Sequence, residues 1–502
     1  MLNFSYANPT RLVFGRSAEH EVGRVMTSIL GRPGKVLVLF GGGSAHRTGI
    51  LEAVEDSLQE SGFAVIEMGG VQPNPRMGFV RDTIDWVRDQ GIRAVVAVGG
   101  GSVIDTAKAV AAGLEYEGDA WDFFAGRAQV EWALPVFAVL TIPAAGSEQS
   151  IRAVITHHGT KTGIGSEHIR PKAAFINPER FLTLPAIHIS AGVCDMLSHI
   201  CERYFSNTAA TDFVDGQAEA ALRTIIKFGP KVLADPSNYD AWCQIGLAGS
   251  FAHNGIFGLG REEDWACHAI EHEISGWNES IIHGCGLAVV MPAWMQQVCH
   301  VNPKRFADFA RRVMGVGQDA DDAAAAALGI EAFKAWLKTM KLPLTLQELG
   351  AVDCPIEALA RHCCRKGAVG HFKPLEKADV EALLRAAQQS ADGMMGERIM
   401  AQQNKGKGRS RRSGSGSTKG QNTLQHPGAV LAQILEDTPT ALAAKWFSLS
   451  EAELLAVLEG RAPMTAAMAQ QAGAVFGTGS APWLEMQSAW DAAHAETNTP
   501  QH

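Results

Sequence analysis

Residues 265–284 read WACHAIEHEISGWNESIIHG and bring three histidines, at positions 268, 272 and 283, into one short segment. His268 and His272 are four residues apart, so they lie on one face of a helix. His283 follows a turn that we expect at 276–278. This spacing predicts that the imidazoles gather at one point of the fold.

A second cluster lies upstream, in the stretch SAGVCDMLSHICERY at 190–204. Asp195 and His199 are again four residues apart, so a carboxylate and an imidazole project from one helical face. Two such helices can enclose one divalent metal, and this ligand set suits Fe(II), Zn(II), Mn(II) or Co(II). Any single histidine is more often a hydrogen-bonded core or surface residue. The paired ligands, together with glycine loops elsewhere in the chain, favour a metal site.

The chain has the length and composition of a multidomain globular protein. Its 502 residues exceed one ordinary core, which predicts two or three domains. A net charge of −9 argues against a nucleic-acid binder as a whole. Residues 1–15 lack a signal-peptide pattern, and apolar runs such as 133–145 are shorter than the roughly 20 residues that span a bilayer. We therefore expect a cytoplasmic protein without a membrane domain.

Two glycine loops each follow a strand-like apolar run. VLVLF at 36–40 precedes GGGS at 41–44, and the strand predicted at 93–98 precedes GGGS at 99–102. A strand, a glycine turn and a helix that opens with serine let backbone amides approach a pyrophosphate. One glycine triplet also serves an ordinary tight turn, but two such loops after buried strands favour a dinucleotide site.

The pattern of secondary structure changes near Pro185. Strands alternate with helices before it, and helical periodicities dominate from there to about Ala391. The first part predicts an α/β domain with a parallel sheet, and the second an all-α domain that carries the metal ligands. We expect the catalytic cleft between them. The other elements expected in the first part are an opening strand or hairpin at 3–14, strands at 63–68 and 136–142, and a helix at 77–90.

Six motifs within residues 3–392 resemble a known family. They are GGGSVIDTAK at 99–108, TIPAAGSE at 141–148, IRPKAAFINPE at 169–179, DMLSHICERY at 195–204, DWACHAIEHE at 264–273 and IIHGCGLAVVMPAWM at 281–295. The chain resembles the iron-containing (group III) alcohol dehydrogenases, and most closely their butanol dehydrogenase and NADPH-dependent aldehyde reductase branch. The resemblance implies a dehydroquinate-synthase-like fold, with a dinucleotide-binding α/β domain at 1–184 and a helical metal-binding domain at 185–392.

The same resemblance implies a set of site residues. It implies that one divalent metal, Fe(II) or Zn(II), is bound by Asp195, His199, His268 and His283. The interval between the last two is one residue longer than is usual in the family, which bears on the geometry at His283. His272 falls near the nicotinamide and the substrate, as a proton carrier or as a residue that only orients a ligand. The implied cofactor-binding residues are Gly41, Gly42, Gly43, Ser44, Asn74, Gly99, Gly100, Gly101, Ser102, Asp105, Lys108, Thr141 and Lys161.

The end of the strand at 36–40 predicts which nicotinamide cofactor is preferred. An acidic residue there would bond the ribose 2′-hydroxyl and repel a 2′-phosphate. The chain has GGGS instead, so we expect NADP(H) to be preferred over NAD(H). The resemblance implies primary alcohols or aldehydes as substrates and a homodimer as the assembly. A polyol dehydrogenase on the same fold is the alternative.

The C-terminal part differs in composition. Residues 393–423 include NKGKGRSRRSGSGSTKGQNT, which predicts a flexible basic linker. Residues 426–491, within a domain expected at 424–502, resemble antitoxins of the host-inhibition-of-growth type, with a helix-turn-helix at 440–447 and 451–458. The second helix presents glutamates where a DNA reader needs basic side chains. A degenerate or protein-binding module is therefore favoured over a DNA or toxin partner, and an enzyme–regulator fusion is the competing interpretation.

Overall fold

The computed structural model describes residues 1–388, 426–435, 440, 444, 447, 449–476 and 480–494. The chain forms two units, Met1–Gln402 and Gln403–His502. Among the described residues, no helix has the length and apolar character needed to cross a lipid bilayer.

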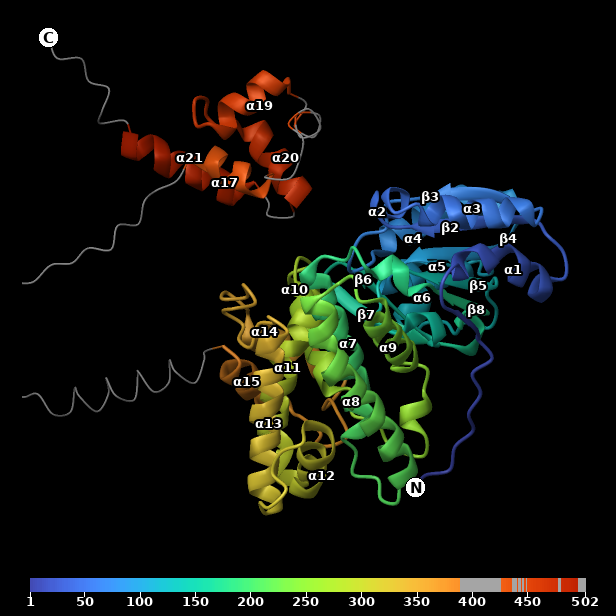
Figure 1. The fold of residues 1–502 in the computed structure, drawn as a ribbon, viewed down its shortest axis with the longest axis vertical. Helices are drawn as coiled ribbons and strands as arrows, with labels where there is room; N and C mark the ends of the chain where they lie inside the picture. The colour runs from blue at the N-terminus through green and yellow to red at the C-terminus, as the bar shows by residue number, and fades with distance from the viewer. Residues whose placement is uncertain are drawn as a thin grey trace, which may run out of the picture. The chain divides into compact units, whose positions relative to one another are not determined.

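The first unit begins with a six-stranded sheet in which every pair of neighbours is parallel, in the order β1-β8-β5-β4-β2-β3 (Figure 1). Its central strands are nearly continuous runs of buried apolar residues, as expected where helices cover both faces. This confirms the predicted parallel α/β architecture. The strands are β1 Arg11–Phe14, β2 Lys35–Phe40, β3 Ala64–Met68, β4 Ile92–Gly99, β5 Val136–Leu140 and β8 Ala173–Ile176.

Two layers of helices bury the two faces of this sheet in separate cores. On one face, α1 (Val22–Leu30) and α3 (Ile50–Glu60) pack against side chains such as Val38. On the other face, α4 (Met77–Val87) and α5 (Gly101–Leu114) pack against the alternate side chains of the same strands. The short helices α2 (Ser44–Arg47) and α6 (Trp121–Phe124) complete this part.

Two local predictions in this part need correction. The strand predicted at 3–14 is shortened to β1, because β8 offers pairing partners only from Arg11 onward, while Leu2 donates its N–H to Gly260 O at 2.7 Å. An antiparallel hairpin, β6 (Arg152–His157) with β7 (Thr160–Gly165), was not predicted. Its tight turn places His158 and Gly159 at positive φ, which only the Gly159 position announces in the sequence.

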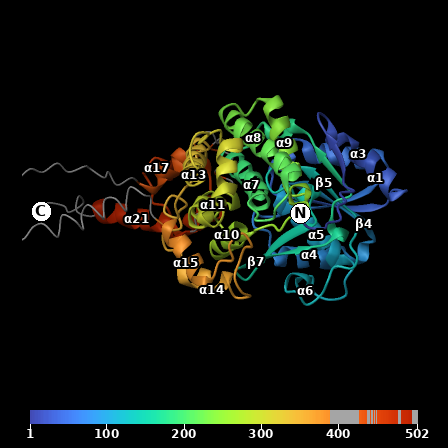
Figure 2. The ribbon, with the colours of Figure 1, turned by 90° about the horizontal axis from the view of Figure 1, so that it is seen from below.

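The rest of the first unit is helical, as predicted. Helix α7 lies buried within it and packs against α8 and α11 (Figure 2). One turn was placed wrongly: α10 continues through Gly276 to Trp277, and a Cβ at Gly276 would lie 2.8 Å from Gly159 O, so the glycine serves close helix–hairpin packing. The helices are α7 Ala186–Tyr204, α8 Asp212–Ala234, α9 Tyr239–Phe251, α10 Ala266–Trp277, α11 His283–Val298, α12 Pro303–Phe309, α13 Asp322–Thr339, α14 Ile356–Cys363 and α15 Lys377–Ala386.

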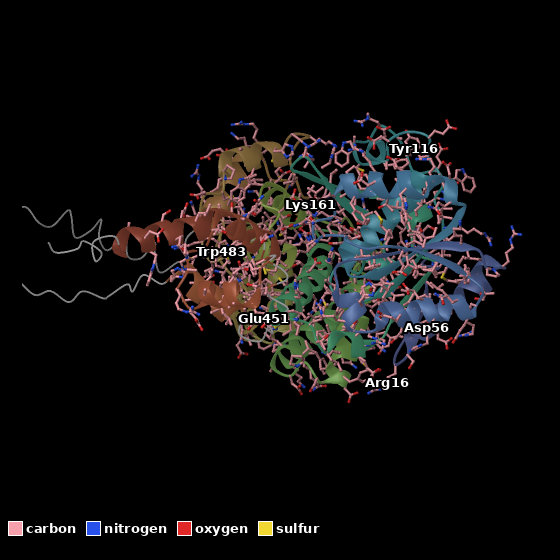
Figure 3. The ribbon with its side chains drawn as sticks, turned by 90° about the horizontal axis from the view of Figure 1, so that it is seen from above. Arg16, Asp56, Tyr116, Lys161, Glu451 and Trp483 are labelled. Carbon is pink, nitrogen blue, oxygen red and sulfur yellow. The ribbon has the colours of Figure 1, made fainter. Side chains whose placement is uncertain are left out.

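The second unit is a small helical domain with a core of its own, built from side chains such as Leu431, Leu454 and Trp483. Figure 3 labels Trp483 and, on α19, Glu451. Helix α19 coincides with the helix predicted at 451–458, and Ser450 and Glu453 form a capping box at its start. Most of the helix predicted at 440–447, and all of 393–423, lie outside the described residues. The helices are α17 Pro427–Ile434, α19 Glu451–Leu458, α20 Ala466–Phe476 and α21 Ala481–His494.

Candidate metal and cofactor site

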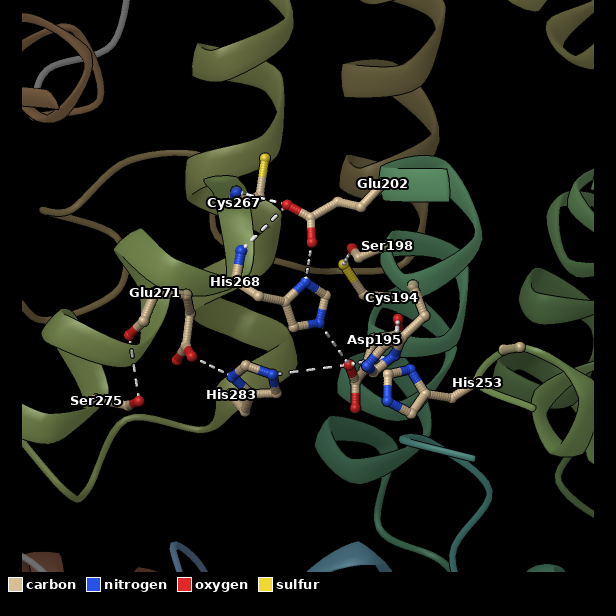
Figure 4. Close-up of polar contacts among 12 residues, drawn as sticks. Cys194, Asp195, Ser198, Glu202, His253, Cys267, His268, Glu271, Ser275 and His283 are labelled. Carbon is tan, nitrogen blue, oxygen red and sulfur yellow. Dashed lines mark hydrogen bonds and ion pairs between the residues drawn. The ribbon is translucent and has the colours of Figure 1, made fainter. Parts of the chain in front are cut away.

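Three helices of the first unit bring the four predicted metal ligands together, and Figure 4 labels Asp195, His268 and His283 among them. Helix α7 supplies Asp195 and His199, both buried, with His199 Nδ1 3.1 Å from Asp195 Oδ1. His268 on α10 and His283 at the start of α11 direct their Nε2 atoms to the same Asp195 oxygen, at 3.7 and 3.8 Å. Residues far apart in the sequence therefore face one carboxylate oxygen.

Two atoms at the centre of this cluster fit a bound cation. Asp195 Oδ1 and His268 Nε2 are buried, and neither has a hydrogen-bond partner among the described residues. A buried polar atom without a partner is costly, and a divalent ion between these atoms would satisfy both. One carboxylate with three imidazoles is also a donor set that Zn(II) and Fe(II) accept.

Two glutamates that the sequence analysis did not single out contact the Nδ1 atoms of His268 and His283. Glu202 Oε2 lies 2.5 Å from His268 Nδ1, and its other oxygen accepts the N–H groups of Cys267 and His268. Glu271 contacts His283 Nδ1 in the same way. Both carboxylates are completely buried. A carboxylate on Nδ1 fixes the ring and leaves Nε2 as the lone-pair donor to a metal.

The electrostatics of the cluster favour a carboxylate anion at its centre. Burial opposes the ionisation of Asp195, yet His199, His268 and His283 hold its pKa well below the usual value. Burial also tends to lower the pKa of His268, but Glu202 and Asp195 outweigh it and raise that pKa to about 9. Burial dominates at His199 and lowers its pKa to about 4.

His272 lies beside the cluster, one helical turn beyond His268. Its ring centroid is 6.3 Å from that of His268 and 5.4 Å from that of His283. Burial, followed by the positive charge of Lys161, lowers the pKa of His272 well below the usual value. A further histidine, His253, was missed: its ring lies 4.4 Å from that of His199, and Arg203 donates to its Nδ1 at 3.0 Å.

The predicted glycine loops meet at the carboxyl ends of neighbouring strands. The loop at 41–43 follows β2, whereas Gly99 ends β4, Gly100 caps α5 and Gly101 and Ser102 begin that helix. Thr141 follows β5 and donates its N–H to Gly99 O at 3.0 Å. The order of strands reverses between β2 and β4, because β3 lies outside β2 whereas β5 lies outside β4. Such a switch point is where open α/β sheets bind ligands.

Asp105 and Lys108, on α5, are occupied with a neighbouring segment. Lys108 is fully buried, and its Nζ lies 2.7–2.9 Å from four oxygens of Ser147, Ser150 and Arg152. Asp105 accepts from Ser147 Oγ at 2.5 Å and from the N–H of Val154 at 2.9 Å. Burial lowers the pKa of Lys108 to about 8 although Asp105 opposes the shift. Both side chains hold the 147–154 segment, and a direct contact with cofactor stays a prediction.

Asn74 and Lys161, both predicted to line the cofactor cleft, contact each other. Lys161 Nζ donates to Asn74 Oδ1 and to Ser275 Oγ, each at 3.0 Å, and lies 3.8 Å from Glu271 Oε2. Asn74 donates in turn to the backbone oxygen of Glu279 at 2.9 Å. Figure 3 labels Lys161 where the strand-rich and helical parts of the first unit meet.

The interval between His268 and His283 contains a turn at 278–282, after the end of α10. The Asn278 side chain accepts from the N–H of Ser280 at 3.1 Å, and its backbone oxygen accepts from Ile281 at the same distance. The turn is thus closed locally, and His283 stays within the cluster.

Comparisons with known proteins agree with this arrangement. Residues 9–178 match the family model "Iron-containing alcohol dehydrogenase", and residues 189–388 match "Fe-containing alcohol dehydrogenase family, C-terminal". A probable NADH-dependent butanol dehydrogenase of Bacillus subtilis is 38% identical over 390 residues, which is 77% of this chain and 100% of the relative. The NADPH-dependent aldehyde reductase YqhD of Escherichia coli is 34% identical over 366 residues, 72% of this chain and 92% of that protein.

A solved structure is also similar to this chain along most of its length. The crystal structure of a butanol dehydrogenase from Thermotoga maritima superposes with a TM-score of 0.74 at 38% identity, and covers 78% of this chain and 99% of that one. The residues that the two family models match lie within the first unit, Met1–Gln402. With both halves of the fold matched by family models and a relative 38% identical over its whole length, the chain belongs to the iron-containing alcohol dehydrogenase family of oxidoreductases.

Proposed function

We propose that the chain is a metal-dependent, NADP(H)-linked oxidoreductase that interconverts primary alcohols and aldehydes by hydride transfer. The observation that carries this proposal is a pair of buried atoms without a hydrogen-bond partner among the described residues, Asp195 Oδ1 and His268 Nε2. Asp195, His199, His268 and His283 would hold Fe(II) or Zn(II). Such an ion, when bound, polarises a carbonyl oxygen as a Lewis acid.

The chain's own residues have three further tasks in this proposal. The amides of the loops 41–44 and 99–102 bind the pyrophosphate at the start of α5. Asn74, Thr141 and Lys161 line the cofactor side of the cleft and orient the nicotinamide half. His272, beside the metal ligands but outside the central cluster, carries a proton between the substrate oxygen and solvent.

The preference for NADP(H) rests on the loop after β2. The segment 41–47 has no acidic side chain and ends in His46 and Arg47, both exposed. Basic groups at this place suit a 2′-phosphate. The names of the relatives include both NADH- and NADPH-dependent enzymes, so similarity alone does not decide the cofactor.

The test combines metal analysis with turnover by the full chain. We expect about one Fe or Zn per chain, NADPH oxidation with straight-chain aldehydes, and loss of turnover after chelation that added metal restores. Faster turnover of glycerol than of straight-chain alcohols would support the polyol dehydrogenase instead. A chain that binds neither metal nor nicotinamide nucleotide would overturn the proposal.

We further propose a cytoplasmic homodimer in which residues 1–184 bind the cofactor and residues 185–392 carry the metal. Light scattering tests the assembly. For the second unit we propose a protein-binding or degenerate module, because α19 exposes Glu451 and Glu453 where DNA phosphates would repel them. Binding of duplex DNA that weakens steeply with salt would contradict this and favour the regulator fusion.

A further inference from the structure

Glu271 lies at a junction between the metal site and the cofactor side of the cleft. Its side chain is completely buried on α10, and one oxygen, Oε2, faces both His283 Nδ1 and Lys161 Nζ, the latter at 3.8 Å. Helix α11 confines it, since a Cβ at Gly286 would lie 2.8 Å from Glu271 Oε1. The carboxylate therefore lies within reach of both partners.

Beyond Lys161 the contacts continue to the loop that contains Asn74. Lys161 on β7 donates to Asn74 Oδ1, and Asn74 follows β3 in the segment that leads to α4. Asn74 has a φ of 53°, a conformation that its contacts to Lys161 and to the Glu279 backbone hold in place. The backbone N–H of Thr156 on β6 also donates to Pro75 O at 2.7 Å, which ties the same loop to the hairpin. A continuous series of polar contacts thus joins His283 to Asn74.

We propose that Glu271 is a positioning residue that couples the two sites, so that metal binding strengthens cofactor binding and the reverse. This inference rests on the proposed function. A metal on Nε2 of His283 makes its Nδ1–H a stronger donor, which fixes the Glu271 carboxylate. A fixed carboxylate holds Lys161 and Asn74 in the arrangement that receives the cofactor, so less conformational entropy is lost on binding. Linkage requires the effect to be reciprocal.

A matched control exists within the same site. Glu202 supports His268 as Glu271 supports His283, and it is equally buried. Its side-chain contacts, however, are to His268 and the adjoining backbone of α10, with none to Lys161 among the described residues. A residue that only orients a metal ligand predicts the same behaviour for both glutamates. Coupling predicts different behaviour.

The experiment measures the Kd of NADPH by fluorescence for the full chain, with and without saturating Zn(II), and metal content in parallel. For the unchanged chain we expect metal to tighten NADPH binding by about five- to tenfold. Glu202→Gln should bind metal less tightly but keep this ratio at saturating metal. Glu271→Gln should bring the ratio close to one.

A second variant guards against misfolding at the buried carboxylate. Lys161→Gln breaks the series of polar contacts one step further from the metal, so this variant should retain metal. It should bind NADPH less tightly both with and without Zn(II), and the ratio of the two Kd values should be close to one. Melting temperatures check that each variant is folded. The coupling would be overturned if Zn(II) tightened NADPH binding by Glu271→Gln as much as by the unchanged chain. It would also be overturned if Zn(II) left the Kd of NADPH for the unchanged chain the same. Absence of any NADPH or Zn(II) binding would instead overturn the proposed function.

Discussion

His268 is held at Nδ1 by Glu202, and its Nε2 lies 3.7 Å from Asp195 Oδ1. We expect His268→Ala to abolish metal retention and turnover, because a site with three of four ligands leaves the ion partly hydrated and easily lost. Metal analysis of the purified variant and an aldehyde-reduction assay provide the measurement. His300, an exposed histidine beyond the end of α11, provides the control. His300→Ala should change neither metal content nor turnover. Normal metal content with normal turnover in His268→Ala would remove this residue from the site.

Gly41 allows a direct test of cofactor preference at a single position. Its φ is not in the left-handed region, and a Cβ there would lie 3.4 Å from Val71 O, an ordinary contact, so a larger side chain fits. Gly41→Asp should shift the ratio of kcat/KM for NADPH over NADH by roughly tenfold or more toward NADH, since like charges placed together cost several kcal/mol. Gly41→Asn has the same shape without the charge and should shift the ratio far less. Equal ratios in all three chains would place Gly41 away from the 2′-phosphate.

At the scale of single residues, sequence spacing predicted that Asp195, His199, His268 and His283 come together, and it missed the two glutamates that contact the histidines. Asp195 and His199, like His268 and His272, are visible because the i,i+4 interval is a local property of one helix. Glu202 and Glu271 occupy equally regular positions, but a glutamate on a helix is usually solvated, and only tertiary contact shows that these two are buried. His253 lies outside both motifs, after the end of α9, so no local pattern announces it.

Helix packing positions His283, and Gly284 makes that packing close. A Cβ at Gly284 would lie 2.0 Å from the backbone oxygen of Ala191, so α11 begins in direct contact with α7. We expect Gly284→Ala to lower the free energy of unfolding by about 1–3 kcal/mol, as overpacked cores do, and to weaken metal binding by moving His283. Chemical denaturation and metal titration are the measurements.

The control for this substitution lies in another helix. Gly216 on α8 is exposed, and a Cβ added to it would meet no other atom within 4 Å. Gly216→Ala should therefore leave stability unchanged or raise it by up to about 1 kcal/mol, from helix propensity. If both alanine variants behave alike, the contact between α7 and α11 does not position the metal ligand.

At the scale of elements, the strands of the sheet were predictable because buried parallel strands read as continuous apolar runs. The segment 3–14 shows the limit of such reasoning, since alternation predicts a strand but a strand also needs a neighbour, and β8 pairs only with its last residues. The hairpin β6–β7 was not predicted, because its turn carries little signal in the sequence. Its turn at His158 depends on a positive φ that histidine only occasionally adopts.

At the scale of the whole molecule, we expect the first unit to work alone. Each unit has its own core, and every residue assigned to chemistry precedes Gln388. A chain that ends at Ser390 should keep its melting temperature, metal content and kinetic constants, because the cut removes no side chain from the first core. The full-length chain is the comparison in calorimetry and steady-state assays. Aggregation or loss of most of the turnover would show that residues 391–502 contribute to the structure of the enzyme.

The ligands of the proposed metal come from three helices, α7, α10 and α11, and span the sequence from Asp195 to His283. An ion held by all of them closes a long loop of the chain, as a removable cross-link does. Ligand binding to the folded state alone adds stability by mass action, by about 2.7 kcal/mol when free metal is a hundredfold above its Kd. The lifetime of this enzyme against proteases would then follow the supply of metal around it, so scarcity would remove the protein as well as its activity.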